Sequence, residues 1–160
     1  MIANHGQSRR YFHDIVGCNS RLDSIQAAVL NVKLKSLDDY IASRRKAADY
    51  YDKAFAGHKN ITIPFRAPYS KHVFHQYTLL LEGIDRNKLN EGLAAKNVPS
   101  MIYYPVPAHR QKMFATADAV LPDLPVTDWL TERVISLPMH TELDQDQLEY
   151  ISTSLLELAG

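Results

Sequence analysis

Two residues near the start of the chain have side chains suited to binding an anion. Asn19 and Arg21 lie two positions apart in a polar stretch interrupted by glycines. A carboxamide can donate a hydrogen bond to a phosphate oxygen, and a planar guanidinium can bind a carboxylate or a phosphate through two hydrogen bonds. Spacing alone favours a plainer interpretation, in which the two residues form a cap and an ion pair at the start of a helix.

A second group lies in a proline-rich segment and contains Tyr103, Tyr104 and His109. Phenol groups can pack on a sugar ring and hydrogen-bond a hydroxyl or a phosphate. The alternative is a strand whose aromatic residues pack on a sheet, which suits Tyr103 as well as pocket lining does and suits Tyr104 less. For His109, a hydrogen bond to a ligand stays open, but a structural role is the better interpretation without geometry.

A metal site made by His72, His75 and another histidine is a further alternative. Positions three apart in an alternating strand point to opposite faces, which disfavours shared coordination. We therefore predict no metal site.

Composition excludes several classes of protein. Lysine plus arginine and aspartate plus glutamate both number 18, so no net field attracts nucleic acid or an anionic membrane. Cys18 is the single cysteine and cannot form an internal disulfide, and residues 1–5 lack the apolar core of an export signal. No apolar run approaches the roughly 20 residues that cross a bilayer. We expect a soluble, cytoplasmic protein.

The leading third of the chain predicts helix. The spacing from Ser20 to Asp23 is typical of a helix start, so a helix should begin there. Apolar residues then recur at helical spacing from Leu22 to Phe55, with a slip in phase near Leu34. The pattern predicts one bent helix or two helices joined end to end, finishing before Gly57.

The rest of the chain predicts a small sheet covered by helices. Strands are expected at residues 61–63, 73–81 and 98–104. Helices are expected from Asp85 to Asn97, within 127–135, and from Asp144 or Asp146 towards the end. The predicted fold class is α/β. Residues 1–57 form a connecting loop and a long leading helix, residues 58–160 form the small α/β domain, and together they make one compact unit.

The stretch that enters the first helix carries a specific pattern. It runs Gly17-x-Asn19-x-Arg21-Leu22-Asp23-x-x-Gln26-Ala27-Ala28 and is followed by Lys33-Leu34. This pattern resembles the segment that joins the large and small domains of pyridoxal-phosphate (PLP) sugar aminotransferases of the DegT/DnrJ/StrS family. Further matches occur in the family's order: His5-Gly6, the strand pattern at 75–81, Tyr104-Pro105-x-Pro107-x-His109 and Ser136-Leu137-Pro138. The resemblance covers essentially the whole chain.

The resemblance implies the small C-terminal domain of a fold-type I PLP-dependent transferase. Such enzymes transfer an amino group, commonly from glutamate, to a ketosugar attached to a nucleotide, and the complete enzyme is expected to be a homodimer. It further implies that Asn19 donates its amide to the PLP phosphate of the partner subunit and that Arg21 binds substrate. Tyr103 and Tyr104 would line the sugar-nucleotide pocket, with His109 near it. Relatives place histidine at position 103, so the departure to tyrosine leaves the identity of the sugar open.

No catalytic residue can be assigned from the resemblance. The family's PLP-bonding lysine and the carboxylate beside the pyridine nitrogen lie upstream of the matching segment. Lys33 and Lys35 follow the joining motif and fall in the predicted helix, so neither takes that role. We expect this segment to be inactive alone. An alternative function is a non-catalytic sugar-nucleotide-binding or dimerisation module derived from the same fold.

Overall fold

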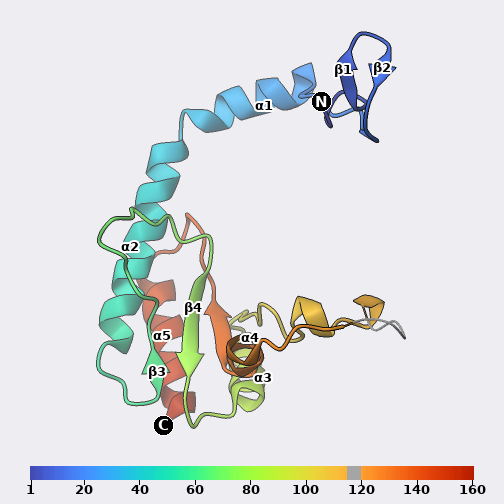
Figure 1. The fold of residues 1–160 in the computed structure, drawn as a ribbon. Helices are drawn as coiled ribbons and strands as arrows, with labels where there is room; N and C mark the ends of the chain where they lie inside the picture. Colours follow the sequence, from blue (N-terminus) through green and yellow to red (C-terminus); the bar gives the residue numbers. More distant parts are fainter. Residues whose placement is uncertain (115–119) are drawn as a thin grey trace. The chain divides into compact units, whose positions relative to one another are not determined.

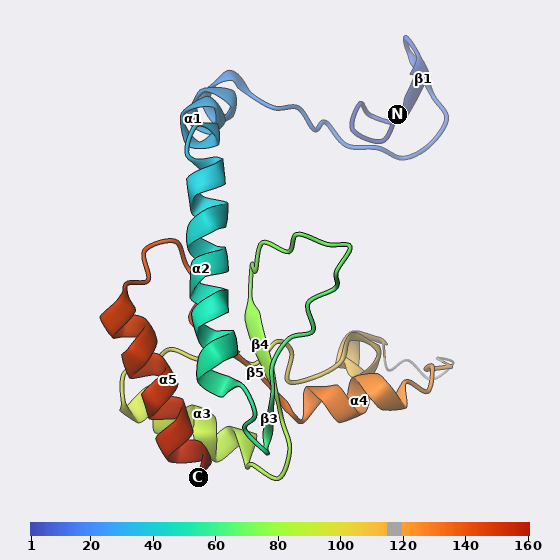
Figure 2. The same ribbon diagram turned by 90° about the vertical axis from the view of Figure 1, so that its left-hand side faces the viewer.

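The computed structural model describes residues 1–114 and 120–160 (Figures 1 and 2). Contacts between residues divide the chain into two units, Met1–Asp39 and Tyr40–Gly160. The division falls within helix α2 (Leu37–Phe55) and does not coincide with the boundary after residue 57 that the sequence suggests. The reason is that the buried residues of α2 belong to the hydrophobic core of the second unit.

The first unit contains a short hairpin and a helix. Strands β1 (Gln7–Arg9) and β2 (Phe12–His13) pair in antiparallel fashion. Helix α1 (Ser24–Leu34) begins later than expected, because Asp23 is its N-cap and accepts a hydrogen bond from the backbone N–H of Gln26 at 2.8 Å. The prediction that the helix starts at Ser20 is therefore wrong.

Two glycines bring the backbone of this unit unusually close together. A β-carbon at Gly17 would lie 2.1 Å from the backbone nitrogen of Gly6, and one at Gly6 would lie 1.7 Å from the carbonyl oxygen of Ile15. Gly6 also has a φ of +73°, in the left-handed region that favours glycine. The loop that leads to α1 thus depends on the absence of side chains at these positions.

The expected break in the leading helix lies at the junction of α1 and α2. The backbone N–H of Ser36 bonds to the carbonyl oxygen of Lys33 at 3.1 Å, which ends α1 before α2 begins at Leu37. Helix α2 ends at Phe55, two residues before Gly57, which has a φ of +74°. The alternative of two helices joined end to end is confirmed.

The second unit is built on a three-stranded antiparallel sheet of order β3-β4-β5. The strands are β3 (Ile61–Thr62), β4 (Tyr77–Leu81) and β5 (Val134–Leu137). Helix α2 covers one face of this sheet together with α3 (Arg86–Ala95) and α5 (Gln145–Ala159), as Figure 2 shows. Asp85 caps α3 and Asp144 caps α5, as the sequence predicts. The α/β fold class is confirmed.

The other face of the sheet is bordered by segments with little regular structure. They include the loop 64–76, two 3-10 turns, η1 (Ala108–Arg110) and η2 (Lys112–Phe114), and the short helix α4 (Pro125–Thr131). Figure 2 shows the loop 64–76 and α4 on the side of the sheet away from α5. Candidate ligand-binding residues are concentrated here.

One expectation for this unit is wrong, and two others are right about the element but wrong about its extent. Residues 98–104 form no strand and contribute only an isolated bridge between Met101 and Ser136. The helix expected within 127–135 ends at Thr131, and the following residues instead pair with β4 as β5. Strand β4 begins at Tyr77 rather than 73, because Phe74 has a φ of +52° that is incompatible with an extended strand.

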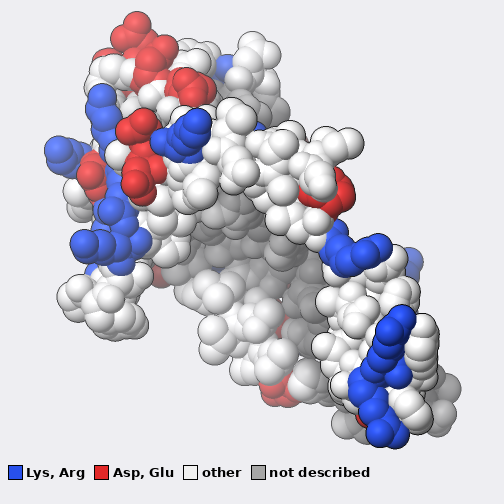
Figure 3. Space-filling model, turned by 90° about the horizontal axis from the view of Figure 1, so that it is seen from above, with Lys and Arg blue, Asp and Glu red and all other residues white. Residues whose placement is uncertain are grey.

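Charged side chains of both signs share the surface. On the face drawn in Figure 3, groups of Lys and Arg lie beside groups of Asp and Glu, and uncharged surface separates many of them. Within the described residues, no helix combines the length and apolar character needed to cross a membrane.

The capping of α5 leads to a prediction about stability. The Asp144 carboxylate accepts from the backbone N–H of Gln147 at 2.8 Å, and the Gln147 side chain accepts from the Asp144 N–H at 3.1 Å. We expect Asp144→Ala to lower the free energy of unfolding by about 1 kcal/mol, and Asp144→Asn to retain most of it, because asparagine caps helices equally well. Urea unfolding followed by circular dichroism measures both. Equal losses in the two variants would contradict the capping role.

Candidate functional site

The predicted tyrosines lie together at a cavity of the second unit. Tyr103 is half-buried and Tyr104 exposed, and their ring centroids are 5.6 Å apart at an interplanar angle of 68°. The cavity has a volume of about 640 Å³ and is bounded by the segment 103–113, by α4 and by Val134 of β5. We call it the tyrosine cavity. Its size is within the usual range for small-molecule sites.

A smaller hollow adjoins the tyrosine cavity and shares Tyr103 with it. We call it the middle hollow. It has a volume of about 140 Å³ and is lined by His75, Gln76, Met101 and Ser136, among others. Together we call the tyrosine cavity and the middle hollow the groove. Among the residues that the structure describes, no lysine, arginine, aspartate or glutamate lines the groove. The groove therefore suits an uncharged ligand group bound by apolar packing and neutral hydrogen bonds.

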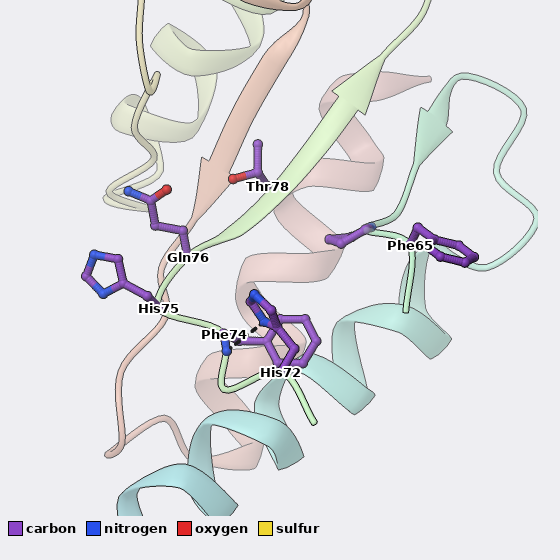
Figure 4. Close-up of a pocket in the computed structure, with 7 residues that line it drawn as sticks. Phe65, His72, Phe74, His75, Gln76 and Thr78 are labelled. Carbon is purple, nitrogen blue, oxygen red and sulfur yellow. Dashed lines mark hydrogen bonds between the residues drawn. The ribbon is translucent and has the colours of Figure 1, made fainter. Parts of the chain in front are cut away.

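A third hollow lies beside the turn that precedes β4 and shares His75 and Gln76 with the middle hollow. It has a volume of about 290 Å³, and Pro64, Phe65, His72, Phe74, His75, Gln76 and Thr78 line it. Figure 4 shows the ring of His72 against that of Phe74, while His75 and Gln76 extend away from these rings. The ring centroids of His72 and Phe74 are 4.6 Å apart. His75 and Gln76 thus border both this hollow and the groove.

The wall of the tyrosine cavity is tied to α4 by an ion pair. The Arg110 guanidinium in η1 donates two hydrogen bonds to the Asp128 carboxylate in α4, one of them from Nε at 2.7 Å. The hydrogen bond from Arg110 holds the pKa of Asp128 below its ordinary value. The positive charge of Arg110 and the neighbouring His109 add to this effect. The pair joins two segments that both line the cavity, so it fixes the distance between them.

His109 lies beside this ion pair and is not among the residues that line the groove. Its side chain is 8% exposed, and its Nε2 is 3.5 Å from Oδ1 of Asp128. That distance permits an electrostatic attraction when the ring is protonated, but Nε2 makes no hydrogen bond within the described residues. The geometry thus places His109 behind the cavity wall, next to the groups that hold it.

Asn19 and Arg21 lie in the first unit, in the segment that leads to α1, and both are exposed. The backbone around Asn19 is fixed by its bridge to Asn4 and by the bond from the N–H of Ser20 to the carbonyl of Ala3 at 2.9 Å. Neither side chain of the predicted pair makes a hydrogen bond or ion pair with another described residue. A fixed backbone therefore presents two polar groups that are free to bind a ligand or another chain.

The two histidines considered for a metal site are not strand residues. Both precede β4, and Nδ1 of His72 accepts a hydrogen bond from the backbone N–H of Phe74 at 3.0 Å. The strand argument used to separate them thus rests on a wrong assignment. Within residues 1–114 and 120–160, no group of three or more histidine, cysteine, aspartate or glutamate side chains is placed to hold a metal ion.

Sequence reasoning missed His75 and Gln76 as groove residues. The sequence predicts both as part of a strand, and nothing in their spacing connects them with Tyr103, 28 positions from His75. The positive φ at Phe74 turns the chain just before them. No local sequence pattern signals such a turn at a phenylalanine.

Comparison with known proteins identifies relatives over nearly the whole chain. The model of the DegT/DnrJ/EryC1/StrS aminotransferase family matches residues 1–156. The UDP-N-acetyl-3-dehydro-alpha-D-glucosamine 3-aminotransferase of Acidithiobacillus ferrooxidans is 40% identical over 95% of this chain and 40% of its own length. The UDP-2-acetamido-2-deoxy-3-oxo-D-glucuronate aminotransferase of Pseudomonas aeruginosa is 40% identical over 96% of this chain and 41% of its own length.

Two solved structures are also similar to this chain over nearly its whole length. S. venezuelae DesV, in complex with a ketimine intermediate, is 34% identical and superposes with a TM-score of 0.86 over 99% of this chain and 42% of its own. A DegT DnrJ EryC1 StrS aminotransferase from Brucella abortus is 32% identical, with a TM-score of 0.83 over 99% of this chain and 42% of its own. The chain thus spans about two fifths of the length of these relatives.

The ion pair beside the cavity leads to a test by titration. We expect Arg110→Met to raise the pKa of Asp128 towards its ordinary value, because the guanidinium hydrogen bonds and charge that favour the carboxylate are lost. A lowered carboxyl pKa stabilises the fold at neutral pH, and this contribution disappears as the pH falls through the lowered value. Carbon-detected NMR of the carboxyl group follows the titration. Arg133→Met is the control, since Arg133 pairs with Glu132 instead. An Asp128 pKa unaffected by Arg110→Met would refute this assignment.

Proposed function

We propose, on the premise that this chain belongs to the DegT/DnrJ/EryC1/StrS aminotransferase family, that it is the small C-terminal domain of an aminotransferase for a nucleotide-linked ketosugar. The observation that carries the proposal is the 40% identity, over at least 95% of this chain, to two relatives named for UDP-linked sugars. Both names specify a 3-dehydro or 3-oxo sugar with an acetyl-amino substituent. We infer that the substrate is a UDP-linked hexose with a carbonyl group at C3. The enzyme replaces the oxygen of this carbonyl with an amino group.

The cofactor of this family is pyridoxal 5′-phosphate. When bound, it supplies the electron sink that amino-group transfer requires. The exposed carboxamide of Asn19 fits its phosphate, because it is a hydrogen-bond donor on a fixed backbone with no side-chain partner within the described residues. We assign Asn19 to the cofactor phosphate of the partner subunit in a homodimer.

Substrate binding is divided between uncharged and charged groups in this proposal. No charged side chain from residues 1–114 or 120–160 lines the groove that contains Tyr103 and Tyr104, so it suits the neutral parts of a sugar nucleotide. A diphosphate needs a cation, and Arg21 is an exposed guanidinium with no acidic partner among the described residues. We therefore assign Arg21 to the charged part of the substrate in the partner's site. His109 acts from behind the wall, by supporting Asp128.

Other features of the complete enzyme follow from the family resemblance. We propose glutamate as the amino donor and the cytoplasm as the location. The exposed, unpaired Cys18 is compatible with a reducing compartment. Helix α1 supports the homodimer, because none of its residues is buried within this chain although its surface carries Ile25, Val29 and Leu30.

The role of Asn19 can be tested in a polypeptide that joins this chain to the lysine-bearing large domain. We expect Asn19→Ala to lower the amount of PLP retained after dialysis, because one hydrogen bond to its phosphate is lost. Absorbance of the bound cofactor measures retention. Asn31→Ala, an exposed asparagine of α1, is the matched control. Wild-type retention in Asn19→Ala would exclude this role.

The role of Arg21 is tested in the same polypeptide. We expect Arg21→Ala to raise the KM for the UDP-sugar by about 10-fold or more, as loss of a charge-assisted hydrogen bond predicts, with PLP retention unchanged. Steady-state kinetics with the sugar and glutamate provide the measurement, and Arg10→Ala is the matched control. If neither Asn19→Ala nor Arg21→Ala changes cofactor retention or activity, the assignment of the loop before α1 is wrong.

A further inference from the structure

Side-chain hydrogen bonds to its backbone hold the turn before β4. Arg44 and Arg45 of α2 donate to main-chain carbonyl oxygens at distances from 2.6 to 3.4 Å. The accepting carbonyls belong to Lys71, His72, Phe74 and His75. Phe74 adopts a φ of +52°, a conformation that a bulky residue keeps only when its surroundings enforce it. The backbone on which His75 and Gln76 sit is thus fixed in place.

His75 differs from other histidines of this unit in what its ring does. Nδ1 of His58, His72 and His140 each accepts a hydrogen bond from the backbone N–H two residues later, at 3.0 to 3.2 Å. These three rings stabilise turns. The ring of His75 makes no such hydrogen bond with any described residue. Its side chain is exposed and lines the middle hollow. A role in holding the local fold therefore does not explain the ring of His75.

Gln76 resembles His75 in this respect. Its carboxamide makes no hydrogen bond to another described residue, although Gln76 is only half-exposed and lines the same hollow. Figure 4 shows both side chains extending from the turn in the direction away from His72. Tyr103 lines the hollow as well. Three polar side chains that can each donate and accept are thus assembled around one small space.

We propose that His75 and Gln76 recognise the hexose of the UDP-linked sugar, by hydrogen bonds to its hydroxyl or acetamido groups in the middle hollow. The inference rests on the proposed function for the identity of the ligand. Hydroxyl and acetamido groups both donate and accept, which matches imidazole, carboxamide and phenol. No charged residue in the described part of the chain lines the middle hollow, so a phosphate or carboxylate would be desolvated there without a counter-charge.

The fixed turn explains how the exposed His75 and the half-exposed Gln76 can discriminate between sugars. A hydrogen bond contributes to binding only after the cost of ordering its groups is met, and a fixed backbone reduces that cost. Arg44 also donates to the carbonyl of Met139 at 3.1 Å, and Met139 is itself a lining residue of the hollow. One guanidinium therefore fixes both the turn that carries His75 and a second part of the wall.

The experiment compares two ligands, one that carries the hexose and one that lacks it. The polypeptide that joins this chain to the lysine-bearing large domain is isotopically labelled and titrated with UDP-N-acetylglucosamine and, separately, with UDP, and NMR follows the His75 ring, the Gln76 amide and both tyrosines. We expect UDP-N-acetylglucosamine, and not UDP, to shift the His75 and Gln76 signals. His75→Ala and Gln76→Ala should each weaken its binding about fivefold, as loss of one hydrogen bond predicts, and leave UDP binding unchanged.

Control variants separate recognition from folding. His58→Ala and Gln145→Ala change the same residue types outside the groove and should leave both affinities unaltered. Phe74 and Tyr77 amide signals report whether each variant keeps the turn.

The outcomes distinguish this inference from the proposed function. If the sugar nucleotide shifts Tyr103 and Tyr104 but not His75 or Gln76, the inference is overturned while the proposed function stands. Equal weakening of UDP and UDP-N-acetylglucosamine in the variants would also overturn it, because the hexose would not be the group recognised. If neither ligand shifts any groove residue, the nucleotide-sugar assignment fails together with the inference.

Discussion

Strand β4 is bonded along both edges and exposes a different set of residues on each face. Tyr77, Leu79 and Leu81 are buried against the helices, whereas Thr78 and Leu80 lie on the opposite face and are only half-buried. A register slip of one residue would exchange the two sets, which makes the pairing with β3 and β5 strongly specified. The hydrophobic core therefore determines which residues face the hollows on the open side of the sheet.

Helix α2 connects this core to the turn that borders the groove. Arg44, Ala48, Tyr51 and Phe55 recur at helical spacing, so Arg44 continues the stripe whose other members are buried. Further along α2, Asp52 accepts a hydrogen bond from the Tyr77 hydroxyl at 2.7 Å and forms an ion pair with Arg66 at 2.7 Å.

The same network extends to Phe74. The guanidinium of Arg66 lies 4.6 Å from the centre of the Phe74 ring, and Phe74 in turn packs against Tyr77 with a centroid distance of 6.2 Å. Burial, together with the bond to Asp52, raises the pKa of Tyr77 far above its ordinary value, so its hydroxyl remains a donor at physiological pH. One helix thus fixes β4 through its core residues and the turn before β4 through its arginines.

Much of this architecture could be predicted because its signals are local. Asp85 and Asp144 identify helix starts through side-chain bonds to nearby backbone groups, and the phase slip near Leu34 locates the break between α1 and α2. The elements that sequence missed depend on distant partners. Strand β5 exists because residues 134–137 pair with β4, more than 50 positions away. Residues 98–104 are mostly apolar, but Pro99 lacks an N–H, and the bridge between Met101 and Ser136 is their only strand-like pairing with a described residue.

The candidate site was predictable only where a motif marked it. Tyr103 and Tyr104 were found through their proline-rich segment and do line one cavity. His75 and Tyr103 line the same hollow because β4 pairs with β5 and Met101 bridges to Ser136. This arrangement of three segments has no local sequence signal. The argument against a metal site was wrong for a related reason, since it assumed a strand where the left-handed Phe74 prevents one.

Separation of charge within the chain bears on why the proposed enzyme would need two subunits. The groove offers neutral hydrogen bonds and apolar walls, so it cannot balance the diphosphate of a sugar nucleotide. Asn19 and Arg21 have the opposite character, since they are exposed polar groups whose side chains bind nothing else among the described residues. The helix that follows them buries none of its apolar residues within its own chain, which is typical of a surface that packs against another subunit or domain. If packing of α1 in the dimer carries this loop to the partner's cofactor, then association would supply the charge that the groove lacks.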